Sequence, residues 1–194
     1  MPELAPGVTL RRATVADVAG IAGVMAGYVE DGSLLPRSTG DLYRSLQEFH
    51  VAAAADGRIL ACAGLRVLWD DLGEVRSLAV RPEAHGQGLG KALVARVLDD
   101  AREMGIGRVI ALTREVVFFE RCGFTVAARE TMPRKVWTDC VVCPRRHACD
   151  EIAVEIELIP GALAKAREAV REWNVPLVPA PAGGAGSAST AAGR

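Results

Sequence analysis

The sequence predicts an α/β fold with a mixed, mainly antiparallel sheet flanked by helices, and three observations favour it. Apolar segments alternate between strand-like and helix-like spacing along the chain. Two turn signals, at Asp56-Gly57 and at residues 70–73, join three strand-like segments into a meander. The 194 residues are 50% hydrophobic and 24% charged, which is typical of a globular chain rather than a disordered one.

The elements of the first half follow from turn and capping signals. A first strand is expected at Val8–Arg12, and the capping box Thr14-x-x-Asp17 opens a helix that ends near Gly27. The apolar side of that helix carries Val18, Ile21, Ala22 and Met25. A loop at residues 31–39 precedes a second helix at 40–48 and two hairpin strands at 49–54 and 59–68.

The second half continues the alternation. A third meander strand is expected at residues 74–81 and an amphipathic helix at 88–104. The apolar run 108–113 predicts a buried strand, and a short helix at 115–121 and a strand at 123–128 follow. A last strand at 152–159 alternates Ile152, Val154, Ile156 and Leu158 with acidic residues on the opposite side.

One domain is expected to account for most of the length. Residues 1–7 are an N-terminal arm, and residues 8–160 form the domain, with a cysteine-containing insertion at about 130–150. A terminal helix is expected at 161–174. The Pro/Gly/Ala/Ser-rich tail at 175–194 is expected to be disordered.

Charge and hydropathy exclude several classes of partner. The 23 basic and 24 acidic residues leave a net charge of −1, which gives no electrostatic basis for binding nucleic acid or an anionic membrane. Residues 1–7 lack the basic flank and apolar stretch of a signal peptide, and no spanning helix is visible. We therefore expect a cytoplasmic monomer or homodimer that acts on small molecules.

The most informative segment is a glycine-rich stretch, residues 85–90 (HGQGLG), between the third meander strand and an amphipathic helix. Glycine lets the backbone approach a ligand closely, and the N–H groups at a helix start favour phosphate oxygens. Taken alone, an ordinary tight turn is an equal alternative. The glycine spacing is not that of a dinucleotide-binding fingerprint, and Lys91 lacks the companion Ser/Thr of a P-loop.

With its surroundings, this segment resembles the GCN5-related N-acetyltransferase (GNAT) superfamily. LAVRP, G-x-G-x-G-K, RVIALT and FFERCGF occur in the order typical of that family, and the resemblance covers roughly residues 8–158. It implies acetyl-CoA as the co-substrate. The resemblance implies that main-chain amides of a bulged strand bind the pantetheine arm, at Leu78, Ala79 and Val80. It also implies that main-chain amides of the glycine-rich loop bind the pyrophosphate, at Gly86, Gln87, Gly88, Leu89, Gly90 and Lys91.

More of the chain is similar to the amino-acid N-acetyltransferases that acetylate glutamate (N-acetylglutamate synthase), in the first step of arginine biosynthesis. The similar segments include LLPRS at 34–38, ILACA at 59–63 and Met132-Pro133. Longer members carry an N-terminal amino-acid-kinase-like domain, so a short stand-alone form is expected. The resemblance implies that Arg37 binds the α-carboxylate as a bidentate fork. It implies further substrate contacts at main-chain groups of Leu35 and Cys62, and at the side chains of Lys135, Arg145 and Arg146.

The predicted catalytic residue is Glu74, at the start of the third meander strand. Many GNAT enzymes have an acid there that acts as general base, often through water, because the amine must lose a proton before it attacks the thioester. A strand-end surface acid is the alternative. A tyrosine general acid often stands where this chain has Phe119. The resemblance implies direct transfer in a ternary complex, so Cys62 and Cys122 are expected to be packed thiols.

Three of the five cysteines form a cluster of spacing C-x2-C-x5-C, at Cys140, Cys143 and Cys149, with His147 inside it. Such ligands suit a structural zinc ion or, as a second possibility, an iron–sulfur cluster. The spacing is standard for neither, and three reduced thiols in an inserted loop are the alternative.

Three functions follow from these features. The first is acetyl-CoA-dependent acetylation of the α-amine of L-glutamate. The second keeps the chemistry and changes the acceptor to glutamine, another amino acid or a protein amine. The third, of another class, is a non-catalytic regulator that senses acetyl-CoA or a metal. Phe119 and the cysteine cluster suggest this possibility.

Overall fold

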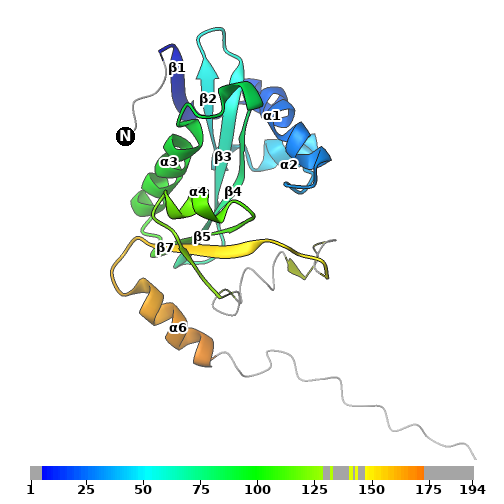
Figure 1. Ribbon diagram of the computed structural model, residues 1–194. Coiled ribbons are helices and arrows are strands. Elements are labelled where there is room, and N and C mark those ends of the chain that lie inside the picture. The colour runs from blue at the N-terminus through cyan, green and yellow to red at the C-terminus, as the bar shows by residue number, and fades with distance from the viewer. Residues whose placement is uncertain (1–5, 129–131, 133–139, 142, 144–146, 173–194) are drawn as a thin grey trace, which may run out of the picture.

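The computed structural model (Figure 1) describes residues 6–128, 132, 140, 141, 143 and 147–172. Within this part of the chain lies a 7-stranded sheet of order β1-β2-β3-β4-β5-β7-β6. The strands are β1 Val8–Arg12, β2 Phe49–Ala54, β3 Ile59–Val67, β4 Leu72–Val80, β5 Arg108–Thr113, β6 Thr125–Val126 and β7 Ile152–Glu157. Neighbours are antiparallel except β4 and β5, which are parallel. The predicted mixed, mainly antiparallel sheet is confirmed.

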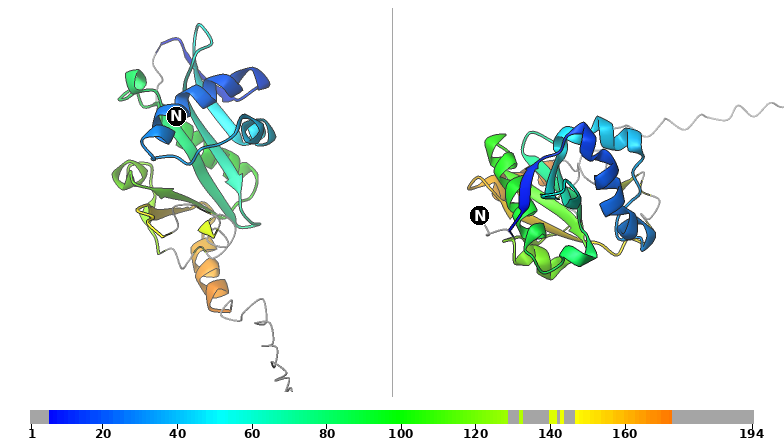
Figure 2. Two further views of the ribbon diagram at one scale, coloured as in Figure 1. Left: turned by 90° about the vertical axis from the view of Figure 1, so that its right-hand side faces the viewer. Right: turned by 90° about the horizontal axis from the view of Figure 1, so that it is seen from above.

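Helices cover both faces of the sheet (Figure 2). They are α1 Val18–Glu30, α2 Thr39–Arg44, α3 Leu89–Glu103, α4 Val116–Glu120 and α6 Ala162–Glu172, with 3₁₀ turns η1 Val15–Asp17, η2 Leu46–Glu48 and η3 Pro82–Ala84. Helices α1 and α2 bury Ile21 and Leu42 against one face, whereas α3 and α4 bury Leu93 and Phe119 against the other. No helix in the described part of the chain is long and apolar enough to cross a membrane.

The capping box before α1 forms as predicted. The Asp17 carboxylate accepts hydrogen bonds from the backbone N–H of Thr14 at 2.7 Å and from its hydroxyl at 2.9 Å. It also pairs with both terminal nitrogens of Arg11, at 2.6 and 2.9 Å, and this pairing holds the pKa of Asp17 well below its usual range. The helix continues past the expected end at Gly27, because Gly27 keeps a helical conformation. The first residue with a left-handed conformation, which typically ends a helix, is Gly32, with φ +74°.

The predicted helix at 40–48 is instead two shorter pieces, α2 and η2, with Ser45 between them. Ser38 caps α2 by accepting the backbone N–H of Asp41 at 3.0 Å. The Asp41 carbonyl accepts both the backbone N–H of Ser45, at 3.0 Å, and the Ser45 hydroxyl, at 2.7 Å. A hydroxyl bonded back to the preceding turn slightly destabilises a helix and often bends it. The helix ends at Ser45, whose φ of −106° and ψ of 15° lie outside the helical region, and the hydroxyl oxygen of Ser45 lies beside the loop that precedes α2.

Strands β4 and β5 separate, and this separation creates the space for the site. They pair only over the first three residues of β4, from Leu72 opposite Arg108 to Glu74 opposite Ile110. Beyond that point β4 carries one extra residue relative to β3, around Ser77, whose φ is +52°. A bulge of this kind bends and twists the bulged strand. In the described part of the sheet, the β5-facing edge of residues 75–80 has no strand partner.

The last strands depart from the predicted pattern. Strand β6 covers only Thr125–Val126 of the expected 123–128. In β7, Ile152 is exposed, whereas Glu155, expected on the solvent side, is buried. The physical reason is Arg108 of the neighbouring strand, which is equally buried and places Nη1 3.6 Å from Oε2 of Glu155. Burying a single charged side chain costs much free energy, whereas two opposite charges that are buried together offset part of that cost.

Candidate active site

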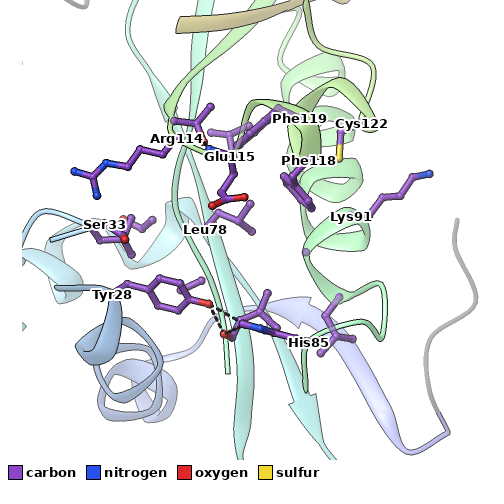
Figure 3. A pocket seen from close by; sticks show the side chains of 18 of the residues that line it. Tyr28, Ser33, Leu78, His85, Lys91, Arg114, Glu115, Phe118, Phe119 and Cys122 are labelled. Atoms are coloured by element: carbon purple, nitrogen blue, oxygen red, sulfur yellow. Dashed lines mark hydrogen bonds between the residues drawn. The ribbon is translucent and has the colours of Figure 1, made fainter. Parts of the chain in front are cut away.

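A cavity of about 730 Å³ opens where β4 and β5 separate (Figure 3). One wall is the free edge of β4, another is the start of α3, and α4 closes the third side with Phe118 and Phe119. Every residue predicted to bind acetyl-CoA except Gln87 lines this cavity: Leu78, Ala79, Val80, Gly86, Gly88, Leu89, Gly90 and Lys91. The Gln87 side chain donates to the Glu83 carbonyl at 3.3 Å instead.

The glycine-rich loop has the backbone that the sequence predicts. Gly86 and Gly88 both have φ +76°, a conformation that favours glycine. A Cβ atom added at either position would meet no protein atom within 4 Å, so the space beside the loop is open. Helix α3 begins at Leu89, and the N–H groups of its first turn lack intrahelical acceptors. An open cradle of amides at a helix start is suited to phosphate oxygens.

Tyr28 closes one end of this cavity, a role for which its position just beyond the predicted end of the first helix gives no signal. Its hydroxyl donates to the Val80 carbonyl at 2.7 Å and lies 3.0 Å from Nε2 of His85 (Figure 3). The same His85 nitrogen lies 2.9 Å from that carbonyl. Helix α1 is thereby tied to the end of β4, next to the glycine-rich loop.

A second cavity, of about 870 Å³, adjoins the first. The two share the lining residues Ser33, Leu34, Val75, Arg76, Ser77, Leu112 and Glu151. The predicted substrate residues Leu35 and Arg37 line the second cavity, together with Glu74. The predicted base and the predicted carboxylate-binding arginine therefore line the same cavity, which adjoins the first. We call this second space the acceptor cavity.

Arg37 enters the acceptor cavity from the loop before α2 and is partly buried. Its Nη2 donates to Oγ of Ser45 at 2.8 Å, and its guanidinium carbon lies 5.5 Å from the centroid of the Phe49 ring. Burial, and then the nearby charge of Arg76, lowers the pKa of Arg37. Among the described residues, no carboxylate lies within ion-pair distance of its guanidinium. The side chain is held in place by the hydroxyls of Ser45 and Ser77 and by the Phe49 ring.

Glu74 lies in the floor of the acceptor cavity and is only 4% exposed. The register of β3 and β4 places it directly opposite Arg66, which lines the same cavity. Arg76, two residues further along β4, pairs with Glu48 at 2.5 Å. The predicted base is therefore a buried carboxylate between two arginine-bearing positions, and the alternative of an exposed strand-end acid is wrong. Nothing in the sequence alone singled out Arg66.

Neither Phe119 nor Cys62 supplies an acid or a nucleophile to the two cavities. Phe119, at the position of the family tyrosine, makes edge-to-face contacts with Phe118 and Phe124, with ring centroids 5.2 and 5.1 Å away. Cys62 is fully buried, lines neither cavity, and its thiol donates to the Ser77 carbonyl at 3.5 Å. Burial raises the pKa of Cys62 to about 12. Its predicted main-chain contact with substrate remains a prediction.

The C-terminal part of the predicted site is described only in part. Lys135, Arg145 and Arg146 lie outside the described residues. Cys140, Cys143 and Cys149 line the acceptor cavity. Within the described part of the chain, however, no group of three or more His, Cys, Asp or Glu side chains is arranged to hold a metal ion. The donor set therefore does not fit a structural zinc ion there.

Comparison with known proteins identifies the family. The model of the acetyltransferase (GNAT) family matches residues 25–124. The chain belongs to this family and is an acyltransferase. An uncharacterized N-acetyltransferase of Chlorobaculum tepidum is 36% identical over 145 residues, which cover 75% of this chain and 93% of that protein.

Two further relatives are named for amino-acid substrates. An amino-acid acetyltransferase of Mycobacterium tuberculosis is 43% identical over 118 residues, 60% of this chain and 67% of that protein. The crystal structure of N-acetylglutamate synthase from Neisseria gonorrhoeae, complexed with coenzyme A and N-acetyl-glutamate, superposes with a TM-score of 0.68 at 31% identity. That match covers 78% of this chain and 35% of the longer synthase.

Proposed function

We propose that this acyltransferase moves the acetyl group of acetyl-CoA to the α-amine of an amino acid, with L-glutamate as the acceptor. Such a reaction is the first step of arginine biosynthesis. The names of the relatives from M. tuberculosis and N. gonorrhoeae support an amino-acid acceptor. We also propose a cytoplasmic setting and one transferase domain over residues 8–160.

The observation that carries the proposal is the state of Arg37. A partly buried guanidinium, fixed by Ser45 and stacked over Phe49, offers a fork of donors without a protein carboxylate among the described residues. A carboxylate bound there would form two parallel charge-assisted hydrogen bonds. An amino acid carries its amine one carbon away from that carboxylate. The amine would then lie near the floor of the same cavity, where Glu74 is found.

In this arrangement acetyl-CoA occupies the first cavity. The amides of residues 86–91 face the pyrophosphate, and the free edge of β4 at residues 78–80 pairs with the pantetheine arm as an added strand would. Because the two cavities share Val75, Arg76 and Ser77, the thioester at the end of that arm reaches the acceptor cavity. Binding both substrates side by side supplies the proximity that direct transfer needs.

Glu74 accepts the proton of the acceptor ammonium, directly or through a water molecule, and the free amine then attacks the thioester carbonyl. The new C–N bond forms as the C–S bond breaks, and coenzyme A leaves as its thiolate. The second proton of the amine passes to that thiolate, directly or through water, which gives the amide and the coenzyme A thiol. Phe119 has no proton to give, so departure of the thiolate does not draw on that position. No cysteine needs to be acylated, which agrees with the burial of Cys62.

The test is a screen of all protein amino acids as acceptors, with release of the coenzyme A thiol as the readout. The proposal predicts the highest kcat/KM for L-glutamate. Preference for glutamine or another amino acid would keep the chemistry and overturn the acceptor. A chain that binds acetyl-CoA but releases no thiol with any acceptor, peptide amines included, would instead be a regulator.

A further inference from the structure

The five cysteines of the chain fall into two groups by their surroundings. Cys62 is fully buried, and Cys122 lines the first cavity (Figure 3). Burial raises the pKa of both of these thiols, which suppresses the reactive thiolate. The other three, Cys140, Cys143 and Cys149, are partly buried and line the acceptor cavity. Thiol chemistry in this chain is therefore expected at the acceptor cavity.

The main chains of two of these cysteines are hydrogen-bonded to each other. The N–H of Cys143 donates to the carbonyl of Cys140 at 3.3 Å, a bond between residues three apart that closes a turn. Turns of this kind bring the two outer Cα atoms within about 7 Å. A disulfide requires a Cα separation of about 4.4–6.8 Å. The hydrogen-bonded turn therefore keeps the main chains of the C-x2-C pair close to the separation that a disulfide needs.

The third cysteine is directed elsewhere. Cys149 lies with its sulfur 3.7 Å from Oε2 of Glu151, within the range of a thiol hydrogen bond. Within the described residues the three thiols do not form a metal-binding group. The sulfur of Cys149 thus faces a carboxylate, whereas Cys140 and Cys143 are the two cysteines whose main chains are hydrogen-bonded to each other.

We propose that Cys140 and Cys143 form a reversible disulfide in the wall of the acceptor cavity, and that this oxidation weakens acceptor binding while acetyl-CoA binding persists. The second half rests on the proposed function, because it takes the acceptor to be the ligand of that cavity. Both cysteines line the acceptor cavity and neither lines the first cavity, so the effect is confined to one substrate.

The oxidant is a disulfide of low molecular weight. One cysteine loses its proton, and its thiolate attacks a sulfur of the small disulfide, which forms a mixed disulfide and releases one small thiol. The second cysteine then attacks the protein sulfur of that mixed disulfide, and the second small thiol leaves. Two electrons pass from the protein dithiol to the small disulfide, and a reductant such as dithiothreitol reverses the exchange.

The experiment compares the full chain before and after treatment with glutathione disulfide. Remaining thiols are blocked with N-ethylmaleimide, and peptides are mapped by mass spectrometry. We expect a Cys140–Cys143 crosslink that dithiothreitol removes, with a KM for L-glutamate on the order of tenfold higher in the oxidised protein and an unchanged Kd for acetyl-CoA. Cys143→Ser should abolish both the crosslink and the change in KM, whereas Cys149→Ser should retain both.

Three results would overturn the inference. Cys140 and Cys143 could both remain accessible to N-ethylmaleimide after oxidation, the crosslink could join Cys149 instead, or the oxidised protein could keep its KM for glutamate. The peptide map needs no turnover, so it decides on the disulfide even for a chain that acetylates no amino acid. In that case the proposed function fails, and with it the claim about acceptor binding, but a mapped crosslink still stands.

Discussion

Arg37 donates from Nη2 to Oγ of Ser45 across 2.8 Å, and this bond ties the acceptor cavity to the break between α2 and η2. The Ser45 hydroxyl donates its proton to the Asp41 carbonyl, so the Ser45 oxygen is oriented to accept a hydrogen bond from the guanidinium. The serine at the end of α2 thus orients the side chain of Arg37, eight residues earlier in the chain.

Removing that hydroxyl should loosen Arg37 without removing its charge. We expect Ser45→Ala to raise the KM for L-glutamate roughly tenfold, the effect of losing one hydrogen bond to a charged group at about 1.5 kcal/mol. The KM for acetyl-CoA should not change. An unaltered KM for glutamate, measured in a variant with unchanged thermal stability, would show that Ser45 does not position the arginine.

The glycine-rich loop offers a matched pair of variants. Gly88 and Gly105 both have φ +76° and open space beside them, but only Gly88 lines the first cavity. Valine should therefore cost a similar backbone strain of about 1–3 kcal/mol at both sites. We expect Gly88→Val to abolish acetyl-CoA binding in calorimetry and Gly105→Val to leave it intact. Equal affinities in the two variants would contradict the assignment of the loop.

Glu74→Gln keeps the shape of the side chain and removes the proton acceptor. We expect kcat to fall by about 10²–10⁴ while acetyl-CoA binding persists. Glu155→Gln is the control, because Glu155 is a similarly buried glutamate that faces Arg108 and lines neither cavity. Its kcat per folded molecule should stay near that of the parent chain. Equal kcat in Glu74→Gln and the parent across the pH range would remove Glu74 from the mechanism.

The capping box at the start of α1 predicts a dependence of stability on pH. Arg11 and Thr14 lower the pKa of Asp17, so its carboxylate stabilises the fold above the unfolded-state pKa of about 3.9 and loses that contribution as pH falls through the folded value. In urea denaturation, Asp17→Asn should cost about 1–2 kcal/mol at pH 7 and progressively less below pH 4. A cost that is constant from pH 7 to pH 2 would contradict this.

Much of the fold was predictable because local signals and packing agree. The Thr14–Asp17 box, the Asp56-Gly57 turn and the apolar spacing of α3 each specify an element that the structure contains. The exceptions arise where hydropathy gives no signal. The chain leaves the helical conformation at Ser45, and the buried Glu155 is paired with Arg108 of the neighbouring strand. Hydropathy alone predicts neither feature.

The site was predictable to a different degree. The glycines of the loop predict its backbone conformation directly, and the structure has the expected positive φ angles and open space at Gly86 and Gly88. Tyr28 and Arg66 could not be predicted, because their roles depend on how α1 and β3 pack beside β4. The spacing of the cysteines suggested a metal ion. Spacing alone does not determine whether three side chains meet at one point, and among the described residues they do not, although all three cysteines line the acceptor cavity.

The central claim is that Arg37 binds the carboxylate of the acceptor. The most direct test is steady-state kinetics of Arg37→Ala with L-glutamate varied at saturating acetyl-CoA. The account predicts a loss of about 2–5 kcal/mol, seen mainly as a raised KM for glutamate, with partial rescue in Arg37→Lys because a point charge cannot replace the fork. Arg102→Ala is the control, since Arg102 is exposed, pairs with Asp99 and lines neither cavity, and its KM should stay near the parent value. An unchanged KM for glutamate in Arg37→Ala would contradict the account.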